Sequence, residues 1–239
     1  MITLGIDTSD ARGSVAVWRN GALMSLQQHE TAEDYSSWLL PAVEKCLRES
    51  EATVKAVSVF GVATGPGSFT GLRVGITAVK AWAELWGKPV VGVSRLEVMA
   101  RTSQAQDGFV AATFNAQRGQ IFAGLYSASV SNGFTLVAQE MVIGAAEFVG
   151  WVAGQAGESR VHWETLDPEL VRQTTAWQER AKRGEVLRLC GTSLAAGVAQ
   201  LAEERAQRGE TSTALHLDAN YVRRSDAEIF WKDPPGDGC

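Results

Sequence analysis

Cysteine is scarce in this chain, and the sequence also lacks any excess of positive charge. The 239 residues include only Cys46, Cys190 and Cys239, which are widely separated and show no CxxC spacing. This pattern indicates no disulfide framework and favours a reducing compartment. With 22 basic against 27 acidic residues, the formal net charge is −5. A chain of this balance has no electrostatic footprint for binding a polyanion unaided, so a nucleic-acid role would depend on a partner.

Long hydrophobic runs and histidine clusters are missing as well. No run approaches the roughly 18 apolar residues that a membrane span requires, and the opening MITLGIDTS has no pattern of a signal peptide. We therefore expect a cytoplasmic protein without membrane association. The three histidines, at 29, 162 and 216, form no ligand pair and no H-E-x-x-H motif, and no G-x-S-x-G is present. The sequence thus predicts no metal site, and no nucleophile elbow supports a serine hydrolase.

The first half of the chain alternates strand and helix patterns. We expect strands over 2–6, 14–18 and 22–29, with Asn20-Gly21 as a hairpin turn, and a helix within 33–50 that begins or kinks near Pro41. A buried strand over 56–64 precedes a glycine-rich segment and a helix that runs to Trp86 and ends at Gly87. A strand over 90–93 and a helix over 95–104, capped by Ser94, complete a mixed α/β unit.

The second half repeats this order. Strands are expected over 109–114, 120–126 and 135–143, helices over 145–156 and 193–206, and a further strand over 160–166. In both halves a strand ends in a short polar residue and Arg-Gly opens the next strand, as Asp7 precedes Arg12-Gly13 and Asn115 precedes Arg118-Gly119. The sequence therefore predicts a duplicated α/β unit, with domains over 1–106 and 107–229 and a flexible tail over 230–239.

Asp7 ends the first strand and is followed by Thr8 and Ser9. A carboxylate at such a strand end commonly lines the ligand crevice of an open α/β sheet, and it could hold a metal-bound nucleotide there. The alternative is that Asp7 only stabilises its own turn. The amides of Gly67 and Ser68, at the start of the glycine-rich helix, could add a weak nucleotide or anion site.

The segment GPGSFTGLRVG, residues 65–75, is neither a dinucleotide fingerprint nor a Walker loop, because its glycine spacing differs and no Lys-Ser/Thr follows. Gly67, Gly71 and Gly75 recur every four residues, so they form a smooth stripe on one helical face. Such a stripe lets another backbone approach closely. It could pack on the chain's own sheet, on a partner helix, or at an anion.

Four segments together resemble the TsaB (YeaZ) family. They are LGIDTS…GSVAVW, the long run from VATGPGSFTGLRVG to SRLEVMA, NAQRGQIFAGLY and YVRRSDAE. The match is densest over residues 1–126 and weak over 145–210, and GPGSFTGLR with its flanking strands is its most specific part. The resemblance implies two tandem actin-like/RNase H-like domains of the ASKHA superfamily, with mixed sheets flanked by helices. This fold agrees with the duplication seen in the sequence.

The resemblance also implies a role in making threonylcarbamoyladenosine beside the tRNA anticodon. Members of the family bind and activate a TsaD-type transferase, which carries the metal. A TsaE-type ATPase joins the complex, and tRNA is reached through it. A homodimer is expected when the chain is alone. No strongly bound cofactor is implied, although ATP or ADP could enter with the complex. The implied partner surface lies on the first two helices and comprises Tyr35, Trp38, Leu39, Phe69, Thr70, Gly71, Leu72, Arg73, Gly75 and Ile76.

Three departures from the family pattern bear on chemistry. Tyr35 stands where the family often has histidine, and Asn115 and Gln120 stand where it often has Asp and Glu. The match is also poor over 157–190. The missing second carboxylate weakens the case for ATP hydrolysis by the chain alone. We therefore expect a non-catalytic scaffold with no catalytic residues. The alternatives are an ATP-dependent phosphotransferase that uses Asp7, and a glycoprotease-like hydrolase, which the lack of a metal cluster disfavours.

Overall fold

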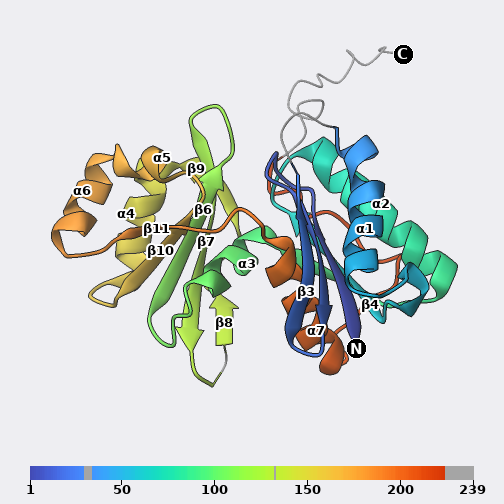
Figure 1. Ribbon diagram of the computed structural model, residues 1–239. Coiled ribbons are helices and arrows are strands. Elements are labelled where there is room, and N and C mark those ends of the chain that lie inside the picture. The colour runs from blue at the N-terminus through green and yellow to red at the C-terminus, as the bar shows by residue number, and fades with distance from the viewer. Residues whose placement is uncertain (30–33, 132, 224–239) are drawn as a thin grey trace, which may run out of the picture.

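The computed structural model describes residues 1–29, 34–131 and 133–223 of the chain. Its first sheet takes five strands in the order β3-β2-β1-β4-β5 (Figure 1). The hairpin strands β1, β2 and β3 pair antiparallel, whereas β4 and β5 extend the sheet in parallel from β1. The strands are β1 (Ile2–Asp7), β2 (Ser14–Arg19), β3 (Ala22–Gln28), β4 (Val59–Gly65) and β5 (Val90–Ser94).

The second sheet repeats this arrangement, with the order β11-β10-β6-β7-β8 and with β9 paired to β7. Its strands are β6 (Phe109–Asn115), β7 (Gln120–Ser129), β8 (Gly133–Leu136), β9 (Met141–Gly144), β10 (Val161–Thr165) and β11 (Leu187–Leu189). Each sheet thus places the first strand of its half between an antiparallel hairpin and a parallel strand. This shared order is what the duplication predicted from the sequence requires.

One expected strand, over 135–143, is wrong. The structure has two strands there, β8 and β9, and both pair antiparallel with β7. The interruption contains Glu140, whose carboxylate turns inward to accept hydrogen bonds from the Ser94 hydroxyl and, at 2.7 Å, from the Tyr126 hydroxyl. A side chain held on another element in this way breaks the alternation that a single strand would need.

Helices cover the outer faces of both sheets. On the first sheet lie α1 (Tyr35–Glu49) and α2 (Phe69–Trp86), with a short 3-10 turn, η1 (Val54–Ala56), before β4. On the second lie α4 (Ala145–Ala156), α5 (Pro168–Arg172) and α6 (Thr175–Lys182). Pro41 lies inside α1 rather than at its start, α2 ends at Gly87 with a left-handed φ of 59°, and the Ser94 hydroxyl caps the following helix as expected.

The two remaining helices lie between the sheets, and each packs on the sheet of the other half. Helix α3 (Arg95–Thr102) follows β5 but contributes to the core with β6 and β7, whereas α7 (Ala195–Gln207) follows β11 but packs on β1, β2 and β4. Figure 1 shows both helices in this central position. The division into domains at residues 106 and 107 stays a prediction. Helix α3 precedes this boundary and α7 follows it, but each packs on strands from the other side of it.

Close approach of α7 to the first sheet depends on glycine. A Cβ atom added at Gly5 of β1 would lie 2.4 Å from the Ala195 carbonyl oxygen and 2.7 Å from the Ala199 Cβ atom. The buried Glu203 of the same helix accepts the backbone N–H groups of Asn20 at 3.2 Å and Gly21 at 2.9 Å. The positive φ angles of Asn20 and Gly21 and the antiparallel pairing of β2 with β3 confirm the predicted hairpin turn. The two bonds to Glu203 tie this turn to a helix from the second half of the chain.

Two further expectations concern the ends of the chain and the membrane. The tail over 230–239 lies outside the described residues. Within the described ranges, no helix is long and apolar enough to cross a membrane.

Candidate functional site

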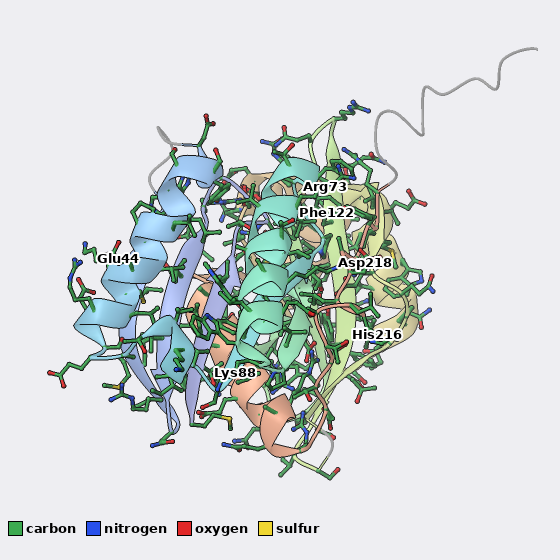
Figure 2. All side chains as sticks on the ribbon, turned by 90° about the vertical axis from the view of Figure 1, so that its right-hand side faces the viewer. Glu44, Arg73, Lys88, Phe122, His216 and Asp218 are labelled. Carbon is green, nitrogen blue, oxygen red and sulfur yellow. The ribbon has the colours of Figure 1, made fainter. Side chains whose placement is uncertain are left out.

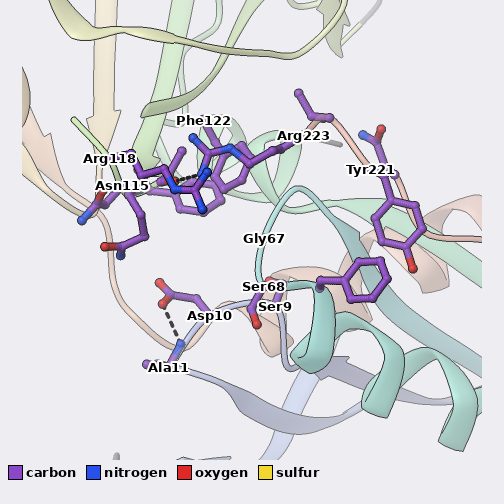
Figure 3. Close-up of a pocket in the computed structure, with 16 residues that line it drawn as sticks. Ser9, Asp10, Ala11, Gly67, Ser68, Asn115, Arg118, Phe122, Tyr221 and Arg223 are labelled. Carbon is purple, nitrogen blue, oxygen red and sulfur yellow. Dashed lines mark hydrogen bonds between the residues drawn. The ribbon is translucent and has the colours of Figure 1, made fainter. Parts of the chain in front are cut away.

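A cleft of about 590 Å³ opens where the first strands of the two halves end (Figure 3). One wall is the turn after β1 with the start of α2, and the opposite wall is the turn after β6. A C-terminal segment over 220–223 closes one side. The duplicated strand order explains this position, because β1 and β6 occupy the same place in their sheets. The lining residues include Ser9, Asp10, Gly67, Ser68, Phe69, Asn115, Arg118, Tyr221 and Arg223.

Asp7 lies beneath the cleft and makes its own turn. Its Oδ1 atom accepts the backbone N–H of Ser9 at 2.9 Å and also the Ser9 hydroxyl. Asn115 makes the equivalent turn at the end of β6, where its Oδ1 accepts the N–H of Gln117 at 2.7 Å. The repeated sequence pattern therefore corresponds to a repeated turn.

A buried arginine is the largest feature of the site that sequence reasoning missed. Arg95, in the first turn of α3, is 0% exposed. Its Nε atom lies 3.4 Å from Asp7 Oδ2, its Nη1 atom lies 3.2 Å from Asp10 Oδ2, and its guanidinium stacks 4.6 Å from the centre of the Phe114 ring. One buried cation thus pairs with two carboxylates, those of Asp7 and Asp10.

The residues around Asp7 do not fit a metal-bound nucleotide. Such a ligand would need a carboxylate oxygen that reaches into the cleft, because Mg²⁺ binds through oxygen atoms. Asp7 is 0% exposed, one of its oxygens is used by Ser9, and the other faces Arg95. Among the residues that the structure describes, no group of three or more His, Cys, Asp or Glu side chains is placed to hold a metal ion.

A second network links the two walls of the cleft. Arg12 donates to Asp10 Oδ2 at 2.9 Å and reaches both carboxylate oxygens of Asp167, which follows β10, at 3.4 Å. Asp167 in turn accepts the backbone N–H of Asn115 at 2.7 Å. Burial acts to raise the pKa of Asp10, but the charges of Arg95 and Arg12 outweigh it and hold that pKa below its ordinary value of 3.8.

Hydrogen bonds hold the C-terminal segment over 220–223 against the second half of the chain, which forms the opposite wall of the cleft. Arg223 donates to the carbonyl oxygen of Ala116 at 2.6 Å and to the Gln120 side-chain oxygen, and Asn220 donates to Glu140 Oε2 at 2.8 Å. Gln120 is one of the two positions where an amide replaces the family's usual acid. Here its oxygen accepts a bond from arginine, so the amide has a structural partner in this chain.

The glycine stripe packs within the chain, which corrects its assignment to a partner. An added Cβ would lie 2.2 Å from the Ser9 carbonyl oxygen at Gly67 and 2.1 Å from the Thr8 carbonyl oxygen at Gly71. At Gly75 it would lie 2.4 Å from the Thr8 hydroxyl. That hydroxyl donates to the Gly71 carbonyl at 2.7 Å, and Ser68 N–H donates to the Ser9 carbonyl at 2.7 Å. The glycines therefore let α2 lie directly on the turn after β1.

The predicted anion site is only partly open to solvent. The structure brings all five of its residues together at this contact, but Asp7, Thr8 and Ser9 are at most 1% exposed. The hydroxyls of Thr8 and Ser9 are used within the chain, and the Ser68 hydroxyl caps α2 by accepting the Gly71 N–H. Binding of a nucleotide or anion here stays a prediction, and only Ser9, Gly67 and Ser68 among the five line the cleft.

Half of the predicted partner surface is also buried within the chain. Leu39, Leu72 and Ile76 belong to the core of the first sheet, and Gly71 and Gly75 face the turn after β1. For these five residues the prediction of a partner contact is corrected, because packing on the sheet or on the turn after β1 removes them from the surface.

The exposed members of the predicted surface gather at the mouth of the cleft. Phe69, Thr70 and Arg73 are exposed at the start of α2, and Figure 2 shows Arg73 at that end of the helix. The Arg73 guanidinium lies 3.7 Å from the centre of the Phe69 ring, and Phe69 lies 5.1 Å from the Tyr221 ring. Tyr221 was not predicted. We call Phe69, Arg73 and Tyr221 the mouth cluster.

The remaining two predicted surface residues are half-buried and make an aromatic group with His29. Tyr35 stacks on His29 with ring centres 4.2 Å apart, and Trp38 contacts both rings edge-on. The Tyr35 hydroxyl donates to the Asp10 carbonyl oxygen, and burial raises the pKa of Tyr35 above its ordinary value. Tyr35 thus holds the turn after β1, which forms one wall of the cleft.

Similarity to known proteins agrees with this description. A family model described as TsaD, tRNA N6-adenosine threonylcarbamoyltransferase, matches residues 28–196. The chain is 27% identical to the tRNA threonylcarbamoyladenosine biosynthesis protein TsaB of Escherichia coli (strain K12), and the match covers 99% of each chain. It is 34% identical to the protein of the same name from Bacillus subtilis (strain 168), over 53% of this chain and 55% of that protein, so this second match spans about half of the relative.

Solved structures resemble the whole of the described fold. A Pseudomonas aeruginosa protein described as similar to peptidase YeaZ superposes with a TM-score of 0.71 at 27% identity, covering 93% of this chain and 99% of that one. The ROK hexokinase from Thermus thermophilus has a TM-score of 0.53 at 12% identity, covering 86% of this chain and 100% of that one. The second likeness concerns the fold alone. It confirms the expected pair of actin-like units with mixed sheets flanked by helices.

Proposed function

Because the chain belongs to the TsaB (YeaZ) family of tRNA threonylcarbamoyladenosine biosynthesis proteins, we propose that it is a non-catalytic subunit that binds and activates a TsaD-type transferase. The match to the Escherichia coli protein carries this proposal, since it extends over 99% of both chains. The proposed complex acts on tRNA in the cytoplasm and includes a TsaE-type ATPase. The chain forms a homodimer when the transferase is absent.

We assign the transferase contact to the mouth cluster with Thr70 and Trp38. All of these side chains are exposed or half-buried. Phe69, Thr70 and Arg73 lie on α2 and Trp38 lies on α1, the two helices that face the viewer in Figure 2, whereas Tyr221 lies on the C-terminal segment and contacts Phe69. Phe69 is 37% and Tyr221 43% exposed. Exposed aromatic and arginine side chains of this kind are frequent anchors of protein interfaces.

Co-elution of the chain with a TsaD-type transferase tests this assignment. We expect the wild type to form a stable complex, and F69A and R73E each to weaken it about tenfold or more, as loss of an interface anchor does. K88E is the matched control, because it reverses one charge beyond the opposite end of α2 (Figure 2). Unchanged affinity in F69A and R73E would remove the mouth cluster from the interface, and no complex with wild-type chain would overturn the proposed function.

The burial of Asp7 supports a non-catalytic role. The competing hypothesis of an ATP-dependent phosphotransferase requires Asp7 in the cleft, whereas Arg95 and Ser9 hold its carboxylate below it. We expect no ATP turnover by the chain alone, no tightly bound cofactor, and ATP or ADP only through the complex. Turnover by the chain alone that disappears in D7A would instead establish the phosphotransferase.

A further inference from the structure

A second pocket, of about 710 Å³, lies at the far end of the second sheet, away from the cleft. Its walls come from the segment before β10, the end of α6 and the strand β11, which lie opposite α1 and α2 in Figure 1. Four arginines line it, Arg160, Arg180, Arg183 and Arg188, against two glutamates, Glu158 and Glu185. The walls therefore carry a net charge of +2 in a chain whose net charge is −5.

One of the two glutamates is already neutralised inside the protein. Glu185 Oε2 accepts the Trp163 Nε1–H at 2.6 Å and the Arg180 Nε–H at 3.0 Å, and its Oε1 pairs with Arg180 at 2.8 Å. Arg180 is 4% exposed, so this pair forms the floor of the pocket. Arg160, Arg183 and Arg188 remain exposed above it.

The exposed arginines have no side-chain hydrogen bond or ion pair with any residue in the described ranges. The charge of Arg188 does act on the buried carboxyl of Glu164. The pKa of His162 reflects the positive charge of Arg160 and Arg188 near it. Burial lowers its pKa, the two arginines lower it further, and Asp107 and Glu185 oppose them only in part. Each exposed guanidinium keeps five donors, which suit the paired oxygens of a phosphate.

We propose that this pocket binds the phosphate groups of an RNA strand. Three guanidinium groups around one hollow can contact successive phosphates, and the neutral imidazole beside them can donate to a phosphate oxygen or a ribose hydroxyl. The choice of RNA over another polyanion rests on the proposed function, which places the chain in a complex that acts on tRNA. The net negative charge predicts no polyanion binding by the surface as a whole, and this pocket is a local exception.

Fluorescence anisotropy with a short labelled RNA stem–loop and the full chain tests the proposal. We expect salt-sensitive binding by the wild type, and in R160Q/R188Q a loss of about tenfold with a salt slope smaller by about two, one for each phosphate contact removed. The control K45Q/R48Q removes two exposed charges from α1 and leaves both quantities unchanged. Equal binding by R160Q/R188Q and wild type, or no binding by the wild type at low salt, would overturn the inference.

Three further arms separate this inference from its rivals. Competition by polyglutamate as strong as that by unlabelled RNA would assign the pocket to an acidic protein segment. Equal competition by inorganic phosphate, at matched ionic strength, would assign it to a free phosphate compound. R160Q/R188Q should still co-elute with the transferase. Loss of that complex would assign the pocket to the protein interface and leave the proposed function standing, whereas failure of the wild type to co-elute would not affect the RNA measurement.

Discussion

At the scale of single residues, Arg95 determines what the carboxylates of the cleft can do. Its guanidinium is fully buried between Asp7 and Asp10. Desolvating such a charge is costly unless an opposite charge lies beside it, and the Asp10 carboxylate, 3.2 Å away, supplies one. The same charge that makes Asp7 unavailable to a ligand therefore also lowers the pKa of Asp10.

The lowered pKa gives D10N a defined pH dependence. A group whose pKa is lower in the folded state than in the unfolded state stabilises the fold at pH values above its unfolded-state pKa. This contribution is lost as the pH falls through the folded-state pKa. We expect D10N to reduce the free energy of unfolding by about 1–3 kcal/mol at pH 7, the cost of losing a hydrogen-bonded charge. The difference should shrink below pH 3.8, the ordinary pKa of the group.

Urea unfolding of wild type and D10N between pH 3 and pH 7 measures this difference, and the range brackets the ordinary value of 3.8. D218N is the control, because Asp218 is exposed and, among the residues that the structure describes, its side chain accepts a bond only from the neighbouring Ala219 N–H. A D10N effect that is constant over this range would show that the ionised carboxylate is not what stabilises the turn.

At the scale of elements, local signals in the sequence were sufficient for most of the first half. Helix α2 ends at Gly87, as the glycine predicts, and the Ser68 hydroxyl caps its start. What packs on its glycine stripe could not be predicted, since a spacing of four identifies a face but not its neighbour. That neighbour is the turn at Thr8, which precedes Gly71 by 63 residues in the sequence.

The site shows the same limit. Asp7 and its turn follow from the strand-end pattern, whereas nothing local marks Arg95 as a buried charge, because arginine in a helical first turn is normally exposed. Residues 157–190 gave little signal, since their elements α5, α6 and β11 are only 5, 8 and 3 residues long. Elements this short depend on tertiary packing rather than on intrinsic propensity.

The packing of the stripe predicts opposite effects for the same substitution in two helices. G71A should reduce the free energy of unfolding by about 1–3 kcal/mol, the usual cost of overpacking, because its Cβ would lie 2.1 Å from the Thr8 carbonyl oxygen. G154A in α4 meets no atom within 4 Å and should stabilise the fold by about 0.5–1 kcal/mol. Thermal and urea unfolding compare the two, and a neutral G71A would mean that α2 does not rest on this turn.

At the scale of the whole molecule, α3 and α7 join the two halves into one folding unit, because each packs on the sheet of the other half. Helix α3 leaves the first sheet to pack on the second, and α7 leaves the second to pack on the first. Arg12 and Asp167 add a link across the cleft. Removing either half would therefore expose the core of the other, so neither sheet is expected to unfold alone.

This coupling predicts that a change on one sheet destabilises both. In A199L, the larger side chain would press on Gly5 of β1. The Cβ atom of Ala199 is already so close to this strand that a Cβ atom built at Gly5 would lie 2.7 Å from it. We expect the urea midpoint to fall by about 1 M, from an overpacking cost of about 1–3 kcal/mol. Hydrogen exchange, followed by mass spectrometry, should show peptides of β1 and β10 losing protection at the same lowered midpoint. Q207L, exposed on the same helix, is the control. Retention of the wild-type midpoint by β10 would mean that the halves unfold separately, because in that case the strain on β1 would not reach the second sheet.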